Sequence, residues 1–205
     1  MLAFYTVFFM ITASFNRSKD MTKIAVWCRH KDDCIIGIGP KIPWNIPSDL
    51  KRFRRITEKA NITCGQTTYE SFPNRTLPNR QIYVLTFDQN YEVSDKQNHH
   101  IVTDVMRLKE FEEPLYIAGG ASIYKLFMQK MAPEVIVDSC NHNEIDKSLK
   151  GSPVNIKECI EKMEKDYVKI SPDYEEDNVT TTIWVKKGEF VDQAILKHIT
   201  NAIIN

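Results

Sequence analysis

Short apolar runs recur between residues 23 and 186, and each run gives way to glycine, proline or a polar stretch. Runs of four to eight residues that are rich in β-branched and aromatic side chains predict strands. The predicted strands cover 23–29 (KIAVWCR), 60–65, 81–87 (QIYVLTF), 134–140 (EVIVDSC) and 179–186 (VTTTIWVK), with a further apolar run at 115–118.

Helical spacing appears in the segments between these runs. Leu50 and Phe53 are three residues apart and predict one apolar face of a helix over 50–59. Ile123, Tyr124 and Phe127 do the same for a helix that begins after Gly119-Gly120. Further helices are predicted within 65–72 (GQTTYESF), near 105–111 and over 154–167, while the rest of 88–114 is polar and predicted to be irregular. The pattern over 191–204 predicts a final amphipathic helix.

The stretch 35–53, IIGIGPKIPWNIPSDLKRF, joins a strand end to a helix through an irregular loop. Gly37 and Gly39 permit unusual backbone angles, and three prolines exclude a regular helix or central strand. Asp49 stands where this loop meets the helix, close to Trp44. Asp49 is either an exposed cap of the helix or an inward acid whose pKa its apolar neighbours raise.

Composition narrows the classes of partner. The formal net charge is zero, so the chain lacks the basic field that binding to nucleic acid or an acidic membrane surface requires. Five cysteines without metal-ligand spacing indicate free thiols in a reducing cytoplasm. No metal site is predicted.

The two ends of the chain differ from the part between them. Residues 1–20 contain a twelve-residue apolar run, LAFYTVFFMITA, which is short for a membrane span and has no preceding basic residue. We expect 1–20 to be an N-terminal extension, with a natural start at Met21; a membrane anchor is the alternative. The apolar face of 191–205 needs a partner surface, either its own domain or a second copy of the chain.

Two motifs carry a resemblance to a known family. The run I-I-G-x-G-x-x-I-P-W-N-I-P-x-D-L-K-x-F and the later I-A-G-G-A-S-I-Y, together with P-N-R at 78–80, resemble dihydrofolate reductase over roughly residues 22–187. The resemblance implies an α/β fold with a twisted, mostly parallel sheet, an antiparallel C-terminal strand and flanking helices. It places the reductase domain at 21–190 and leaves 191–205 as a helical extension.

The resemblance also implies an activity. It is the NADPH-dependent reduction of 7,8-dihydrofolate to 5,6,7,8-tetrahydrofolate, a step of one-carbon metabolism, with hydride passing to C6 and a proton to N5. Asp49 is the catalytic acid, and Trp44 belongs to the loop that closes over the nicotinamide. Departures in that loop and at Asp138 favour weakened binding of trimethoprim and hence antibiotic resistance.

On the substrate side, the resemblance assigns Arg80 to the α-carboxylate of the glutamate tail. Asn79 stands where the family has glycine and is expected to adopt the left-handed conformation. The position that usually carries a threonine near the acid is taken by Asp138, or by Ser139 if the register is shifted. The substrate-binding residues implied are Val26, Trp27, Cys28, Asp49, Leu50, Phe53, Phe72, Leu77, Arg80, Ala118, Tyr124 and Asp138.

On the cofactor side, glycines let the backbone approach a pyrophosphate closely, and the free N–H groups at helix starts can bind it. Gln66 occupies a position that is commonly basic in the family, so the preference for NADPH over NADH is less strict. The cofactor-binding residues implied are Cys28, Ile36, Gly37, Ile42, Gly65, Gln66, Thr67, Thr68, Leu85, Thr86, Gly119, Gly120, Ala121, Ser122, Ile123 and Tyr124.

Two alternatives to this function stay open at this point. One is a reductase of riboflavin synthesis that shares the fold, and the other is a folate- or nucleotide-binding protein that has lost catalysis. The expected partners are dihydrofolate and antifolate small molecules, without nucleic acid or a membrane. The chain is expected in the cytoplasm, as a monomer or as a homodimer through its C-terminal helix.

Overall fold

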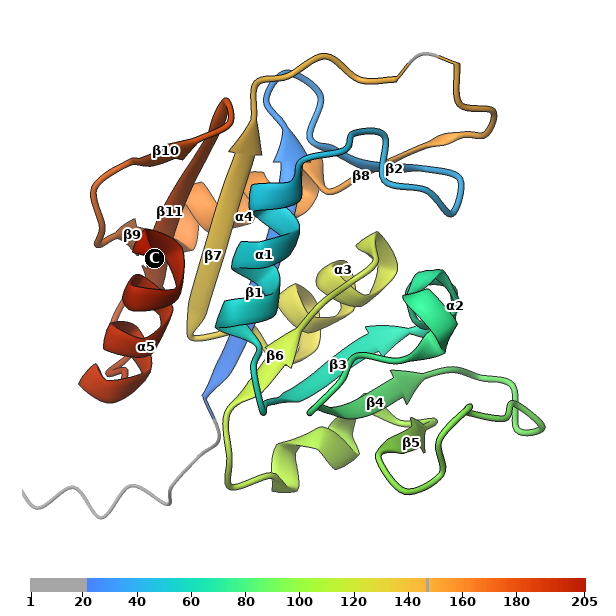
Figure 1. The fold of residues 1–205 in the computed structure, drawn as a ribbon. Coiled ribbons are helices and arrows are strands. Elements are labelled where there is room, and N and C mark those ends of the chain that lie inside the picture. Colours follow the sequence, from blue (N-terminus) through green and yellow to red (C-terminus); the bar gives the residue numbers. More distant parts are fainter. Residues whose placement is uncertain (1–21, 147) are drawn as a thin grey trace, which may run out of the picture.

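The computed structural model describes residues 22–146 and 148–205. Within these residues nine strands form one twisted sheet, in the order β10-β11-β7-β1-β6-β3-β4-β5, with β9 paired to β11 (Figure 1). The strands are β1 (Lys23–His30), β3 (Asn61–Gly65), β4 (Gln81–Leu85), β5 (His99–Val102), β6 (Leu115–Ile117), β7 (Val135–Asn141), β9 (Tyr167–Lys169), β10 (Tyr174–Glu176) and β11 (Val179–Lys186).

The middle of the sheet is parallel and its C-terminal edge is antiparallel. β1 pairs in parallel with both β6 and β7, and β3 pairs in parallel with β4 and β6. β11 runs antiparallel to β7, β9 and β10. This confirms the predicted fold class, a mostly parallel sheet with an antiparallel C-terminal strand.

Helices cover both faces of the sheet. They are α1 (Pro47–Ile56), α2 (Gln66–Ser71), α3 (Ala121–Lys130), α4 (Lys157–Asp166) and α5 (Gln193–Ile204), with 3-10 turns η1 (Pro73–Arg75) and η2 (Val105–Glu110). Alternate residues of β1 point to opposite faces. Ala25 and Trp27 join a core cluster that contains side chains of α3 and α4. Ile24 and Val26 join a second cluster with Ile56 of α1 and side chains of α5.

Several short strands, among them β9 and β10, were absent from the sequence prediction. β5 lies inside the stretch predicted to be irregular, where only His99–Val102 pairs with β4. A separate two-stranded ribbon pairs β2 (Ile35–Ile38) with β8 (Pro153–Asn155). Short strands of three or four residues carry too little periodic signal to stand out from loops.

The C-terminal helix packs on its own domain. Ile199, Ala202 and Ile203 of α5 are buried in the cluster that Ile56 of α1 shares. Arg55 donates a hydrogen bond from Nε to the Ala202 carbonyl at 2.8 Å. The predicted amphipathic helix thus exists, and its own chain covers this apolar face. The predicted N-terminal extension, 1–20, lies outside the described residues.

Candidate active site

Asp49 lies in the first turn of α1 and faces inward. The helix begins at Pro47, and Ile46 is the N-cap residue, so Asp49 is not the cap. The Asp49 side chain is only 18% exposed, and Arg52 Nη1 lies 3.3 Å from its Oδ1. Of the two interpretations of this acid, the structure therefore supports the inward one.

The surroundings of Asp49 act on its proton affinity in opposite directions. Burial raises the pKa of the Asp49 carboxyl, whereas the Arg52 charge and a hydrogen bond with the Cys28 thiol lower it; the net shift is upward. The pKa of Cys28 is itself raised well above its usual value, chiefly by burial and then by the Asp49 charge. Cys28 therefore remains a thiol that can donate to the carboxylate.

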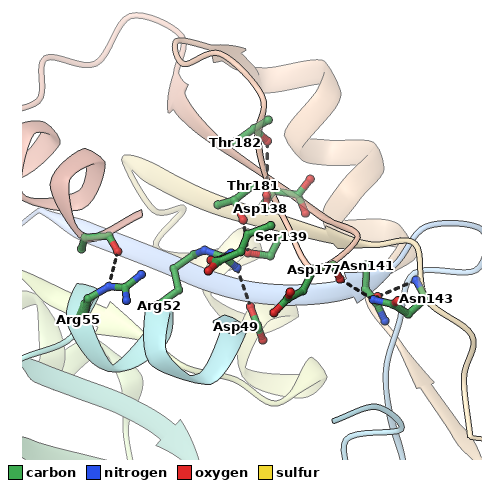
Figure 2. A network of polar contacts seen from close by, with 12 residues as sticks. Asp49, Arg52, Arg55, Asp138, Ser139, Asn141, Asn143, Asp177, Thr181 and Thr182 are labelled. Carbon is green, nitrogen blue, oxygen red and sulfur yellow. Dashed lines mark hydrogen bonds and ion pairs between the residues drawn. The ribbon is translucent and has the colours of Figure 1, made fainter. Parts of the chain in front are cut away.

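The register of β7 decides between Asp138 and Ser139. β1 pairs with β7 so that Trp27 is opposite Asp138 and Cys28 is opposite Ser139. Ser139 therefore shares the face of Cys28 and Asp49, and its Oγ lies 3.0 Å from Thr181 Oγ1 (Figure 2). Alternation sends Asp138 to the other face.

Asp138 has its own partners on that other face. It accepts hydrogen bonds from Trp27 Nε1 at 2.7 Å, from Arg29 Nε at 2.9 Å and from Arg29 Nη2 at 3.0 Å. The expectation that the Asp138 side chain contacts the substrate is corrected by this arrangement. Ser139, the alternative left open by the sequence, is the residue that faces the acid.

Arg80 is buried against the end of α1. Its guanidinium donates to the carbonyls of Arg54 at 2.6 Å and Thr57 at 3.1 Å, and to the Pro78 carbonyl. Glu58 lies 3.3 Å from Nη2. Asn79 has φ +62°, which confirms the left-handed conformation expected of it. Burial lowers the pKa of Arg80, although Glu58 opposes this shift.

The predicted wall residues divide between the two faces. Val26, Phe53, Leu77 and Ala118 meet in one cluster on the α1 side. Leu50 is 55% exposed, and Phe72, Leu77 and Ala118 pack against a neighbouring cluster. The Trp27 side chain instead lies on the α3 side, where its ring meets Tyr124 edge-on at 5.2 Å. A ligand on the Asp49 side of the sheet could therefore contact the backbone of Trp27 but not its side chain.

A tight backbone turn precedes α3. Gly119 has φ +93°, and a Cβ at this position would lie 2.7 Å from the Tyr124 ring, so only glycine fits. The Tyr124 hydroxyl donates to the Val26 carbonyl at 2.6 Å and links α3 to β1. Burial raises the pKa of Tyr124 far above its usual value, so the hydroxyl keeps its proton.

The predicted cofactor residues gather around this turn. Gly65 donates its N–H to the Gly119 carbonyl at 2.8 Å, and a Cβ on Gly120 would lie 3.2 Å from Thr68 Oγ1. The start of α2, with Gln66, Thr67 and Thr68, therefore lies against the start of α3, with Ala121, Ser122 and Ile123. Gly120, the N-cap residue of α3, supplies no side-chain acceptor for the N–H groups of the first turn. Backbone of this kind suits an anionic pyrophosphate.

Gln66 is a neutral residue, and its side chain hydrogen-bonds to the Thr86 hydroxyl and the Glu70 carboxylate. Its Oε1 accepts from Thr86 Oγ1 at 2.9 Å, at the end of the strand that contains Leu85. Its Nε2 donates to Glu70 Oε1 at 3.2 Å. The side chain at this position is therefore neutral and held beside an acid.

An open cleft of about 860 Å³ lies beside the loop that precedes α1. Ile42 and Trp44 line one side of it, and residues of the segment 143–149 line the other. Backbone hydrogen bonds join the two sides: Gly39 N–H to the Ser152 carbonyl at 3.0 Å, and Asp146 N–H to the Pro43 carbonyl at 2.9 Å. Ile36 and Gly37 belong to β2 at the base of this loop. The sequence alone did not indicate that 143–155 supports it.

Two residues near Asp49 received no role from the sequence. Arg52 follows Asp49 by one helical turn, and Glu176 reaches Arg52 from β10. The spacing of three between Asp49 and Arg52 was the available signal, because residues three apart are neighbours on a helix. Nothing in the sequence links Glu176 to either residue.

Metal-binding clusters and membrane spans are both absent from residues 22–146 and 148–205. No group of three or more His, Cys, Asp or Glu side chains in these ranges could hold a metal ion. No helix among the same residues has both the length and the apolar character needed to cross a membrane.

The fold and the site together define an α/β protein with an inward acid in the first turn of α1 and a glycine turn where the starts of α2 and α3 lie close together. A family model described as "Dihydrofolate reductase" matches residues 23–167. The chain belongs to the dihydrofolate reductase family.

Individual relatives agree with this assignment. A dihydrofolate reductase of Enterococcus faecium is 30% identical over 107 residues, which cover 51% of this chain and 64% of the relative. Dihydrofolate reductase type A13 of Escherichia coli is 38% identical over 93 residues, 45% of this chain and 56% of the relative. The chain thus matches somewhat less than two thirds of the length of these relatives.

A solved structure has the same fold. It is dihydrofolate reductase from Enterococcus faecalis complexed with NADP(H) and RAB-propyl, with a TM-score of 0.66 and 21% sequence identity. The similarity covers 82% of this chain and 99% of the other.

Proposed function

We propose that this chain reduces 7,8-dihydrofolate to 5,6,7,8-tetrahydrofolate with NADPH. The observation that carries the proposal is Asp49, an acid with a raised pKa that faces inward at the start of α1. An acid whose pKa moves toward neutrality is suited to general acid catalysis. The family to which the chain belongs has this activity in its name.

Asp49 orients the pterin ring and favours a proton at N5. Ser139 and Thr181 lie on the same face and offer hydroxyl groups that can hold the ring or a bridging water. Phe53, Leu77 and Ala118 supply the apolar wall, against which an aromatic ring can stack. Ile42 and Trp44, on the loop that lines the cleft, exclude water when the loop closes.

The backbone around Gly119 and Gly120 fits a dinucleotide. A Cβ at either position would crowd Tyr124 or Thr68, so both positions favour glycine, and the turn brings the start of α3 close to α2. Gly65, Thr67, Thr68, Ala121 and Ser122 would hold the phosphates, while Leu85 and Thr86 would lie near the adenosine end. When bound, NADPH supplies the hydride that reaches C6.

Arg80 would hold the α-carboxylate of the glutamate tail. A guanidinium surrounded by carbonyls is fixed in orientation, and one of its two Nη1 hydrogens has no partner among the described residues. An arriving carboxylate would take that hydrogen and compete with Glu58 for Nη2.

The remaining expectations follow from the same proposal. Antifolates would bind in the substrate site, and weakened trimethoprim binding would make the chain a resistance variant. We place the reductase domain at 21–190, with α5 packed on it, and we propose a cytoplasmic monomer.

The test is an absorbance assay at 340 nm with dihydrofolate and NADPH, on the full chain and on Asp49→Asn. We expect turnover in the full chain and about a hundredfold loss in Asp49→Asn at pH 7, because an amide cannot supply a proton. Low pH should restore part of the activity of Asp49→Asn. Turnover of the full chain falls as pH rises through the pKa of Asp49, since the acid form is lost.

The same assay separates the alternatives. Binding of dihydrofolate without turnover would identify a protein that has lost catalysis. Activity with a pyrimidine of riboflavin synthesis and none with dihydrofolate would identify the other reductase. Near-normal rates in Asp49→Asn at pH 7 would show that Asp49 is not the acid.

A further inference from the structure

The guanidinium of Arg52 is buried next to Asp49, the proposed catalytic acid. The Arg52 side chain is 2% exposed, and it projects from α1 between two carboxylates on different elements. Nη1 lies 3.3 Å from Asp49 Oδ1, and Nη2 lies 3.1 Å from Glu176 Oε2 on β10. Figure 2 shows Arg52 and Asp49 side by side on α1, with the dashed contact between them.

The two carboxylates are not equivalent partners. Removing a guanidinium from water is costly unless opposite charge compensates it. Glu176 is 52% exposed, so solvent screens its attraction, whereas Asp49 is 18% exposed. Arg52 Nε is buried and has no partner among the described residues, so the two Nη contacts carry the compensation. Asp49 in its ionised form is therefore the stronger counter-charge.

We propose that Arg52 is a positioning residue that stabilises the ionised form of Asp49 against burial and fixes its orientation, and that this contact weakens the binding of cationic ring systems relative to neutral ones. This inference rests on the proposed function for its catalytic meaning. A carboxylate already paired with a guanidinium has less negative charge to offer a ligand. A neutral dihydropterin loses little binding affinity through this pairing. A protonated 2,4-diaminopyrimidine must compete with Arg52 for the Asp49 carboxylate.

Other groups near Asp49 do not duplicate the effect of Arg52. From β1, the Cys28 thiol is a neutral donor, and from α3 the Tyr124 hydroxyl keeps its proton. From the β10–β11 side come the acids Glu176 and Asp177, of which Glu176 is already paired with Arg52. Across the sheet, Arg29 is paired with Asp138. Among the described residues, Arg52 is the cation within hydrogen-bond distance of Asp49.

The direct test is the pKa of Asp49 itself, read by NMR of ¹³C-labelled aspartate carboxyls in the full chain. The signal is identified by its absence in Asp49→Asn. Arg52→Gln should raise the pKa of Asp49 by at least about one unit, since a close opposite charge typically lowers a carboxyl pKa by one to three units. Arg52→Lys, which keeps the charge, should restore most of the shift.

Arg54→Gln is the matched control. It removes one cation from the same helix, but Arg54 is exposed, and among the arginines of α1 it is Arg52 whose charge acts on the pKa of Asp49. The pKa of Asp49 should stay in place in this variant. An equal rise in Arg54→Gln and Arg52→Gln would mean that net charge, not the contact, sets the value, and would overturn the proposal.

Ligand affinity provides a second readout that needs no turnover. Arg52→Gln should bind trimethoprim, as the protonated 2,4-diaminopyrimidine, at least about tenfold more tightly by calorimetry, with much less change for dihydrofolate. In turnover, the descending limb of the pH profile should move to higher pH in the same variant. Unchanged trimethoprim affinity together with an unmoved pKa of Asp49 would overturn the proposal.

Glu176→Gln keeps the test decisive if Arg52→Gln does not fold. Glu176 is half-exposed, and its loss leaves Asp49 as the remaining partner of Arg52. The pKa of Asp49 should then fall, and an unmoved value would contradict the proposal. The proposed function and the role of Arg52 can fail separately. Absent turnover with the expected shifts in the pKa of Asp49 would refute only the function. Normal turnover with an unmoved pKa of Asp49 would refute only the role of Arg52.

Discussion

At the scale of single residues, Arg80 combines two roles that one substitution would remove together. Its guanidinium satisfies the carbonyls of Arg54 and Thr57 at the end of α1 and also lies beside Glu58. Carbonyls in the last turn of a helix have no partner within the helix, so Arg80 completes that end. A side chain of this kind both stabilises α1 and fixes the direction of its remaining hydrogens.

Arg80→Leu should therefore raise the KM for dihydrofolate more than the KM for a pteridine that lacks the glutamate tail. Losing one partner of a charge-assisted bond costs about 1.5–3 kcal/mol, or roughly a tenfold to hundredfold change. Arg75→Leu, on the exposed turn of the same loop, is the control and should change neither KM. Equal effects on both substrates would show that Arg80 acts only on the end of α1.

Gln66 sets a second expectation at this scale. The Gln66 side chain is neutral and hydrogen-bonded to Glu70. At this position a 2′-phosphate would therefore meet an amide and not a cation. Gln66→Arg should lower the KM for NADPH by about tenfold and leave that for NADH nearly unchanged, since charge-assisted bonds are stronger than neutral ones. Gln66→Leu controls for loss of the amide. A constant NADPH/NADH ratio in Gln66→Arg would place phosphate recognition elsewhere.

At the scale of elements, α5 braces the helix that carries Asp49. Ile199, Ala202 and Ile203 share a core cluster with Ile56, and His198 Nε2 lies 3.0 Å from the Ile56 carbonyl. None of the predicted site residues belongs to α5. The helix therefore contributes to stability and to the placement of α1, not to contacts with ligand.

Deletion of 191–205 should accordingly lower the melting temperature while folded molecules stay active. Each fully buried aliphatic side chain contributes about 1.5–3 kcal/mol, so the loss should reach several kcal/mol and shift the midpoint by roughly 10 °C. Circular dichroism measures the shift, and the 340 nm assay at low temperature measures activity. His198→Gln, which retains the helix, is the control. Lost activity in a folded deletion variant would mean that α5 completes the site.

At the scale of the whole molecule, the parallel strands bring the two halves of the site together. β1, β3, β4 and β6 run in the same direction, so their carboxyl ends meet at one edge of the sheet. Gln66 follows β3, Thr86 follows β4 and Gly119 follows β6 at that edge. Ligands bind outside the carboxyl ends of strands in sheets of this kind. Segments that are far apart in the sequence thus form one surface.

Much of this arrangement is determined by the amino-acid sequence itself. Apolar runs and glycine turns located β1, β3, β4, β7 and β11, and the two motifs marked Asp49 and the Gly119-Gly120 turn. Asn79 was also identified, because asparagine readily accepts the backbone conformation that glycine usually supplies. These features depend on local chemistry, which neighbours in the chain determine.

Tertiary structure alone decided the rest. β7 is apolar on both faces near Val137, so its sequence could not show that Ser139, not Asp138, faces Asp49; pairing with β1 set that register. The partnership of Arg52 with Glu176 joins residues 124 positions apart. Whether α5 covers its own domain was decided by its packing against α1. Contacts between distant segments follow from the packing of the whole sheet, and no local pattern encodes them.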